Sequence, residues 1–414
     1  MKRTILLCFI AVSLHAQTQI RPEISKEQAT TIVRIAVPRP EGVPLEMIEA
    51  PFFAPLTRDL AASGVFAIAP IPPNLPPDTN LAKAANAEYV LSLKFTQQEQ
   101  DFVVAARLLD PTGVTQFGRA YRGVAAALPR MSHMLANDLV REMTGKPGIF
   151  LSQIAYASNR SGNWEIWLMD WDGSNQRQIT NHRAMAILPS WSPDNDRMVY
   201  TLFSGGRSEM YIINRRGGGR IHVQTGVGLN TSATFSPVSN DIAFVGSVRG
   251  NPDIYVIKDD STNLRRLTSE GSIESTPEWS PSGRQISFTS GRSGTPQIYI
   301  MDADGSNVQR ISFDGDWNDD ATWSPDGVHV AYTSRVNGKF QIRLANVVNG
   351  ETHILAGEGW NEQPSWSPDG QWIVFQSNRS GRWQVYRMRA DGTDLLQLTF
   401  DGENKEPDWS KKVE

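Results

Sequence analysis

The sequence predicts a small α/β domain followed by an all-β six-bladed propeller that its own C-terminal strand closes. An aromatic-serine pair recurs at steps of 43 or 44 residues, a period typical of four-stranded propeller blades. The chain also has 12 Trp, 33 Gly and 25 Pro among 414 residues, which indicates a β protein rich in turns. The pairs begin at Trp191, Phe235, Trp279, Trp323, Trp366 and Trp409.

Each repeat contains runs for four short strands. After the aromatic strand at Trp279 come "QISFTS", "QIYIMD" and "VQRIS", each of strand length and bounded by turn residues. The Pro-x-Gly that follows the serine predicts a tight turn, because proline fixes φ and glycine accepts positive φ. The second and third runs occur six times each, so we expect six blades.

The ends of the repeat pattern predict how the ring closes. The first repeat, from Ile154, has no aromatic strand before it, and the aromatic strand at Trp409 has no strand after it. We therefore expect "PDWSKK" to pair with "IAYAS" as the innermost strand of the first blade, which removes an unpaired edge. The six aromatic side chains are expected to pack between neighbouring blades rather than around a ligand.

The segment before the repeats predicts the α/β domain, which we place at residues 31–146, with the propeller at 147–414. Strand-like runs alternate there with helical stretches at 52–64 and 128–145. The second stretch is amphipathic and ends at Gly145, a residue type that favours a helix C-terminus.

The first 30 residues predict export. Lys2 and Arg3 precede an apolar run that is too short to cross a bilayer as a helix. This pattern predicts a signal peptide at residues 1–16 and a periplasmic protein. The chain's one cysteine, Cys8, lies within that segment. Residues 17–30 are polar without periodicity, which predicts a flexible tail.

Composition and motifs give no support for catalysis, a cofactor, a metal or nucleic acid. The 40 Lys+Arg nearly balance 44 Asp+Glu, so no basic field attracts a phosphate backbone. Nucleophile-elbow, dinucleotide, P-loop and zinc-helix motifs are missing from the sequence. "DWDGSN" and "DADGSN" place glycine too early for a calcium loop and predict hairpin turns. The histidines beyond the signal occupy unrelated positions of the repeat: 133, 182, 222, 329 and 353.

Polar residues before each aromatic are the candidate binding site. The fifth and third residues before it lie where the chain enters each innermost strand, so we expect them to ring one mouth of the channel. The partner-binding candidates are Asn230, Glu274, Asn318, Asp320, Asn361, Glu362, Gln363, Asn404 and Glu406. The loop between the second and third strands faces the same mouth. Its arginines predict a basic rim: Arg160, Arg207, Arg249, Arg292, Arg335 and Arg379. Such a face suits docking of a peptide or protein segment; ordinary loop polarity is the alternative.

The architecture resembles the TolB family, periplasmic propellers of the Tol-Pal envelope system. The junction "LVREMTGKPGIFLSQIAYASN" at 139–159 is similar to that family's passage into the ring. The resemblance implies protein binding without catalysis: a Pal-like lipoprotein docks at the channel mouth, and the N-terminal tail engages a TolA-like inner-membrane protein. It also implies roles in outer-membrane integrity and cell division, with membrane association only through partners.

Two other functions stay open at this stage. A secreted propeller enzyme, a lyase or hydrolase acting on polysaccharide or peptide in the channel, would need converging His, acids or metal ligands. The acids Glu274, Asp320 and Glu406 are available, but no histidine stands at the matching ring positions. The non-catalytic part of a propeller peptidase would need a hydrolase domain after the ring.

Overall fold

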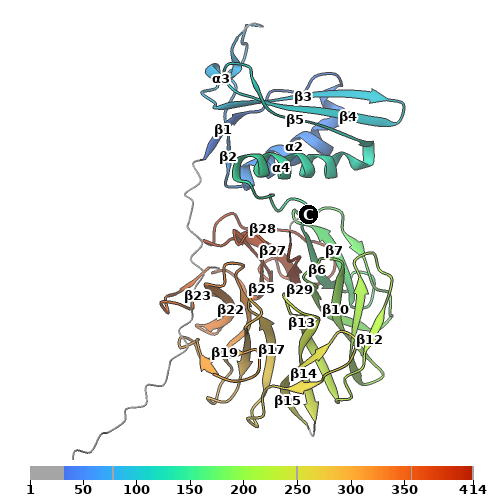
Figure 1. Ribbon diagram of the computed structural model, residues 1–414, viewed down its shortest axis with the longest axis vertical. Coiled ribbons are helices and arrows are strands. Elements are labelled where there is room, and N and C mark those ends of the chain that lie inside the picture. The colour runs from blue at the N-terminus through green and yellow to red at the C-terminus, as the bar shows by residue number, and fades with distance from the viewer. Residues whose placement is uncertain (1–31, 77–78, 249, 356, 413–414) are drawn as a thin grey trace, which may run out of the picture.

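The computed structural model describes residues 32–76, 79–248, 250–355 and 357–412. An α/β domain lies on one face of a β-propeller (Figure 1), which confirms the predicted fold class. The predicted signal peptide and tail lie outside the described residues, and the domain boundary at residue 146 stays a prediction.

The α/β domain is a five-stranded sheet in the order β2-β1-β3-β4-β5. Two helices, α2 and α4, run side by side along the face of this sheet that is turned towards the ring (Figure 1). Helix α4 matches its prediction and ends where Gly145 adopts φ 75°. Helix α2 begins later than expected, because a π-helical turn, η1, precedes it. The elements are β1 Val33–Ala36, α1 Leu45–Ile48, η1 Glu49–Phe53, α2 Ala54–Ala62, β2 Phe66–Ile68, α3 Leu81–Ala84, β3 Tyr89–Gln98, β4 Asp101–Leu109, β5 Thr115–Val124, η2 Ala125–Ala127 and α4 Leu128–Thr144.

The propeller consists of six antiparallel sheets of four strands each. The first blade is β29 Asn404–Trp409, β6 Gln153–Ser158, β7 Glu165–Asp170 and β8 Arg177–Gln178. The second is β9 Met185–Trp191, β10 Arg197–Ser204, β11 Arg207–Asn214 and β12 Ile221–Val223; the third is β13 Leu229–Phe235, β14 Asp241–Val248, β15 Asn251–Lys258 and β16 Arg265–Arg266. The fourth is β17 Glu274–Trp279, β18 Gln285–Ser290, β19 Gln297–Asp302 and β20 Gln309–Arg310. The fifth is β21 Asn318–Trp323, β22 His329–Val336, β23 Lys339–Asn346 and β24 Thr352–Ile354; the sixth is β25 Asn361–Trp366, β26 Trp372–Ser377, β27 Gln384–Arg389 and β28 Leu396–Gln397.

The ring closes as the sequence predicts. Strand β29 pairs antiparallel with β6, and Trp409 lies opposite Ile154. The Trp409 indole nitrogen donates to Ser152 Oγ at 2.8 Å, which joins the last strand to the segment just before β6.

The repeated aromatic side chains pack between blades, as expected. All six are buried. Trp366 Nε1 donates to the Thr322 carbonyl of the neighbouring blade at 3.3 Å, and Trp191 Nε1 reaches Asp408 O at 3.2 Å. Burying each ring contributes a few kcal/mol at ~25 cal/mol per Å².

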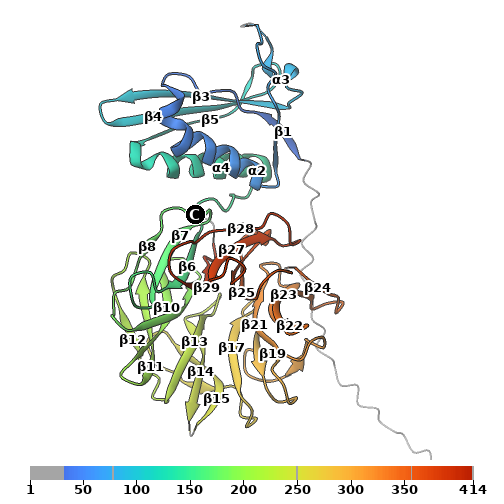
Figure 2. The same cartoon turned by 180° about the vertical axis from the view of Figure 1, so that it is seen from behind.

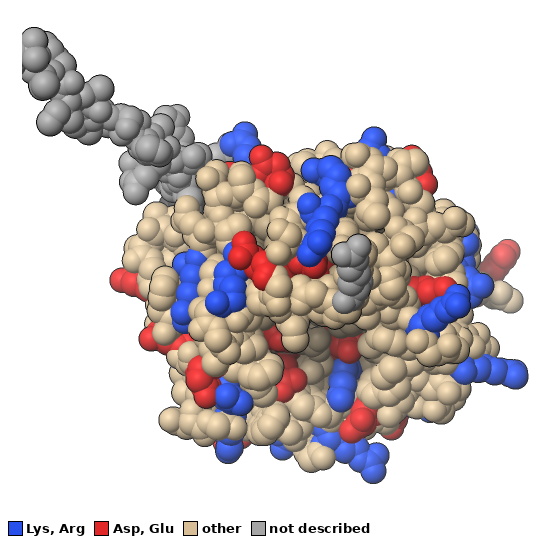
Figure 3. All heavy atoms as spheres, turned by 90° about the horizontal axis from the view of Figure 1, so that it is seen from below, with Lys and Arg blue, Asp and Glu red and all other residues tan. Residues whose placement is uncertain are grey.

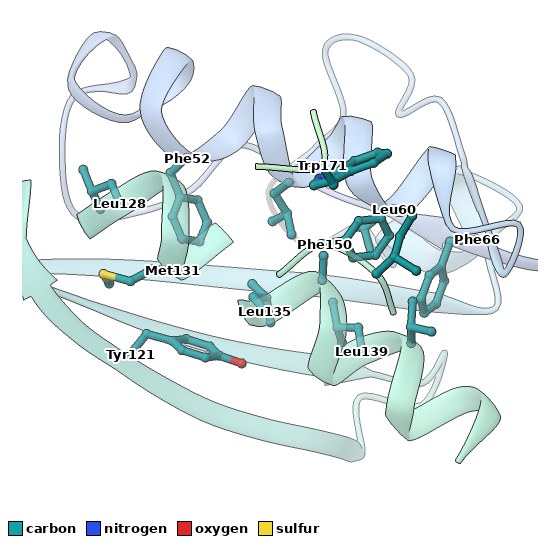
Figure 4. Close-up of a cluster of buried hydrophobic side chains, with 14 of the residues drawn as sticks. Phe52, Leu60, Phe66, Tyr121, Leu128, Met131, Leu135, Leu139, Phe150 and Trp171 are labelled. Carbon is teal, nitrogen blue, oxygen red and sulfur yellow. The ribbon is translucent and has the colours of Figure 1, made fainter. Parts of the chain in front are cut away.

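The α/β domain covers the ring face that carries the aromatic ends of the innermost strands (Figure 2). Arg58 of α2 pairs with Asp172 of the ring at 2.5 Å. Phe150 packs edge-on against Trp171, with ring centroids 5.2 Å apart, and both join the domain's apolar cluster (Figure 4). The opposite ring face is therefore the one this domain leaves uncovered.

Candidate functional site

Every innermost strand contains a bulge at the third residue before its aromatic. The register shifts there in all six ladders, for example between Glu362 and Ser365. The bulged residues adopt left-handed φ values of 44° to 56° although none is glycine, a conformation that costs ~1–2 kcal/mol each. They are Leu188, Ser232, Thr276, Asp320, Gln363 and Glu406.

The bulges line a central cavity of about 130 Å³ with three consecutive residues from each blade. The first ring consists of the bulged residues. The second ring is small and apolar: Pro189, Ala233, Pro277, Ala321, Pro364 and Pro407. The third ring consists of Ser190, Thr234, Glu278, Thr322, Ser365 and Asp408. The prediction therefore included Asp320, Gln363 and Glu406 of the first ring but none of the deeper residues.

Carboxylates gather on one half of the cavity, in the fifth, sixth and first blades. Burial, followed by the charges of Asp319, Glu362 and Glu406, raises the pKa of Asp320 well above its usual range. Burial also raises the pKa of Glu362, and it raises that of Glu406 to about 7. Glu406 accepts a 2.6 Å hydrogen bond from Leu188 N of the neighbouring second blade. This half can therefore supply hydrogen-bond acceptors to a segment that enters.

Lys411 lies at the cavity end that faces the α/β domain. Its ammonium group is 2.9 Å from Asp408 Oδ1 and 3.8 Å from Glu278 Oε1. Burial alone would lower the pKa of Lys411, but these two carboxylates outweigh it and raise the pKa. The sequence shows a lysine here, in "WSKK", where all five other repeats have proline, and this departure was the available signal for the contact.

Most of the predicted residues at the fifth position before the aromatic are buried inside their own blades. Asn230, Glu274, Asn318, Asn361 and Asn404 are all less than a tenth exposed. Asn361 Nδ2, for example, donates to Gln341 Oε1 and to the Glu358 carbonyl, both at 2.9 Å. Glu362 is half-buried and accepts from Gln376 Nε2 at 3.0 Å. These side chains stabilise the segments that lead into the innermost strands. Their contact with a partner stays a prediction.

The predicted rim arginines fall into two groups. Arg160, Arg292 and Arg379 fold back over their own blades. Arg379 Nη2 donates to Asn361 Oδ1 at 2.7 Å, and its guanidinium lies 5.1 Å from the Tyr386 ring. Arg207 is exposed. Arg335 turns away from its serine, lies 5.5 Å from the Trp317 ring centre and pairs with Asp316 at 2.8 Å. Arg249 lies outside the described residues.

The first-ring residues face the side of the propeller opposite the α/β domain. Figure 3 looks onto that face and shows a hollow at the ring centre with acidic side chains in it. We call this entrance the open mouth. No three His, Cys, Asp or Glu side chains gather as metal donors within the part of the chain that the structure describes. Over the same residues, no helix combines the length and apolar character that a bilayer crossing needs.

Comparison with known proteins gives a consistent result. A family model described as the TolB beta propeller domain matches residues 140–413. "Tol-Pal system protein TolB" of Syntrophotalea carbinolica is 32% identical over 206 residues, 47% of each chain. "Protein TolB homolog" of Chlorobium chlorochromatii is 43% identical over 101 residues, 24% of this chain and 23% of that one. The matches thus span about half, or less, of these relatives' length. The crystal structure of TolB from Acinetobacter baumannii superposes with a TM-score of 0.78 at 27% identity, over 92% of this chain and 97% of that one.

Proposed function

This chain belongs to the TolB β-propeller family, and from that membership we propose that it is a protein-binding scaffold of the Tol-Pal system. The proposal places it in the periplasm, where it docks a Pal-like lipoprotein and supports outer-membrane integrity and cell division. The observation that carries it is the superposition on a TolB structure over 92% of the chain, because this agreement includes both the α/β domain and the ring.

The proposed docking site is the open mouth. It lies away from the α/β domain, so a partner reaches it without displacing that domain. Asp320, Gln363 and Glu406 present acceptor groups around a cavity of about 130 Å³, which is small enough that only a narrow segment enters. In this proposal the remaining partner surface rests on the surrounding loops.

The same proposal assigns the N-terminal tail, residues 17–30, to a TolA-like inner-membrane protein. These residues lie outside the described part of the chain, and the assignment follows family membership alone. We further propose that the protein is not an enzyme, because binding at the open mouth requires no nucleophile, general base or metal.

Affinity for a purified partner tests the proposal. The soluble domain of the Pal-like lipoprotein from the same organism would be titrated by calorimetry with wild type, Asp320→Ala and Gln363→Ala. Each substitution should cost on the order of 1–3 kcal/mol of binding free energy, since each truncates an acceptor at the centre of the interface.

The matched control is Val348→Ala. Val348 is 51% exposed in the β23–β24 turn, on the ring side that carries the α/β domain. This variant should bind like wild type. Absence of measurable binding by wild type would refute the proposed partner, and equal loss in all three variants would refute the proposed site.

A further inference from the structure

Three blades share one arrangement at their open-mouth ends. In the sixth blade, Asn361 lies opposite Ser377 and Phe375 opposite Tyr386, so these four side chains occupy one sheet face. Arg379, two residues after the serine, covers them. Its Nε donates to Ser377 Oγ at 3.1 Å and its Nη2 to Asn361 Oδ1 at 2.7 Å. Arg292 and Arg160 make the corresponding bonds in the fourth and first blades.

The fifth blade keeps this face but not its arginine. Asn318 lies opposite Ser334, and Tyr332 lies opposite Arg343. Here the loop arginine, Arg335, stands one residue after the serine rather than two. The strand therefore directs Arg335 to the other sheet face, where it lies over the Trp317 ring and pairs with Asp316.

Four buried polar atoms on this face have no hydrogen-bond partner among the described residues. They are Asn318 Oδ1, Tyr332 Oη, Ser334 Oγ and Arg343 Nε. We call them the polar socket. Asn318, Tyr332 and Ser334 are 0% exposed, and an unpaired buried polar group costs ~1–3 kcal/mol. A cluster of this kind on a single sheet face therefore opposes folding unless another group pairs with it.

The hydrogen-bond donors and acceptors of the polar socket determine which chemical group fits it. Asn318 Oδ1 can only accept, Arg343 Nε can only donate, and the two hydroxyls can do either. The nearby charges are already paired, Arg343 with Asp314 at 3.1 Å and Arg335 with Asp316 at 2.8 Å. A second cation would face both arginines, so a neutral group with its own donor and acceptor fits better. A primary carboxamide has this pattern.

The residues around the polar socket include an exposed segment through which a side chain could enter and a row of aromatic rings beside it. The exposed segment 313–316 covers the socket, and a Cβ on Gly315 would lie 2.9 Å from Ser334 Oγ. Beside it, Trp317, Phe340 and Trp360 form an edge-to-face row with centroids 6.3 and 5.4 Å apart. Trp317 is 36% exposed and Trp360 40%, which leaves aromatic surface for an incoming apolar side chain.

We propose that the fifth blade binds an asparagine or glutamine side chain of the docked partner in this polar socket, with Gly315 moved aside and the ion pairs of Asp314 and Asp316 kept. The inference rests on the proposed docking at the open mouth and names the chemistry that the partner must present there.

The test uses Tyr332→Phe/Ser334→Ala, which removes both hydroxyls with little change in shape. Its affinity for the soluble domain of the Pal-like lipoprotein should fall by about tenfold, as expected for two lost hydrogen bonds. Its melting temperature should be unchanged or higher, because the free protein loses two unpaired buried groups. The matched control, Ser377→Ala, should melt lower, since Arg379 loses its acceptor, and should bind like wild type. Unchanged affinity of the double variant would overturn the inference and leave the proposed function standing.

A second readout does not depend on the lipoprotein. Acetamide, the smallest primary carboxamide, would be titrated into the ¹⁵N-labelled full chain at millimolar concentrations, with guanidinium chloride at matched ionic strength. Acetamide should shift the amide resonances of Gly315 and Ser334 in wild type but not in the double variant. A response to guanidinium alone, or to neither compound, would overturn the assignment even if the lipoprotein binds. If acetamide binds and the lipoprotein does not, the socket stands and the proposed partner fails.

Discussion

Replacing Trp409 by alanine tests ring closure directly. The Trp409 side chain is 0% exposed, and its indole nitrogen donates to Ser152 Oγ at 2.8 Å. Its backbone N–H donates to Ser365 Oγ of the sixth blade at 3.0 Å, so the residue contacts both sides of the closure. Truncating a buried tryptophan costs ~3–5 kcal/mol, and losing the indole hydrogen bond adds ~1 kcal/mol. We expect a total near 5 kcal/mol.

Trp279→Ala is the matched comparison within the same ring. Trp279 occupies the equivalent place in the fourth blade and is 6% exposed, and its Nε1 has no partner among the described residues. Its truncation should cost ~3–4 kcal/mol, about 1 kcal/mol less than that of Trp409. Urea unfolding followed by circular dichroism gives both values.

Amide hydrogen exchange distinguishes two effects of Trp409→Ala: lost side-chain packing and lost pairing of β29 with β6. If β29 holds the ring shut, Trp409→Ala should speed exchange in β6 more than in β18 of the fourth blade, because β6 loses its partner strand. Removing residues 405–414 should destabilise the whole propeller and speed exchange in every blade. A Trp409→Ala protein whose β6 exchanges like wild type, or whose unfolding free energy falls by less than that of Trp279→Ala, would refute the closure argument.

Three further predictions concern charged groups. Glu406→Gln should stabilise the protein at pH 8 but not at pH 4: the folded pKa is about 7, above the ordinary value, so wild type loses stability as pH rises from about 4.5 to 7. Thermal unfolding at both pH values would show the difference. Arg379→Ala should cost ~1–2 kcal/mol for two buried hydrogen bonds, whereas Arg335→Ala, at a surface pair, should cost less than ~0.5 kcal/mol; similar urea midpoints would contradict this. Burial alone would lower the pKa of His133, but its bond to Asp59 raises it. The stabilising effect of His133 is therefore complete below pH ~6.5 and lost as pH rises through the folded pKa, and the melting-temperature gap to His133→Gln should be wider at pH 6 than at pH 9.

The sequence was sufficient for the fold because the repeat constrains it many times over. Each blade needs an aromatic wedge at the same place, so Trp191 and its five counterparts mark the register of every innermost strand. The incomplete repeats at Ile154 and Trp409 leave one way to pair the chain ends. A misread strand in one repeat is recognised by comparison with the other five. The blade count and the closure were both predictable for this reason.

Side-chain direction within the repeat was harder to predict, because it depends on the bulge. A strand with simple alternation would place the fifth and third residues before the aromatic on the same face. The left-handed residue, such as Gln363 with φ 52°, breaks that alternation. It sends three consecutive residues into the cavity and leaves Asn361 inside the blade. Residue type gave no warning, since the bulged residues are not glycines.

The predicted rim arginines differ in orientation for a similar reason. The serine pairs with a glutamine seven residues later in both the fifth and the sixth blade, yet Arg335 and Arg379 differ by one place relative to that serine. In a β-hairpin one place reverses the direction of the side chain. Counting arginines per loop therefore could not distinguish one that covers its blade from one that reaches solvent.

The two ends of the cavity differ in a way that bears on how a partner enters. At the end near the α/β domain, Lys411 bridges Asp408 and Glu278, so the deepest carboxylates already have a cation from the chain itself. At the open mouth, Asp320 and Glu362 are near other acids, and their pKa values are raised by burial and, for Asp320, by mutual repulsion. Burial also raises the pKa of Glu278 at depth, but Lys411 opposes that shift. Among the described residues, the cavity carboxyl groups Asp320 and Glu362, which have no ion pair, therefore lie at the entrance. A segment that inserts part-way gains these contacts without displacing Lys411, so the described geometry favours a tip held at the entrance over a chain threaded through the ring.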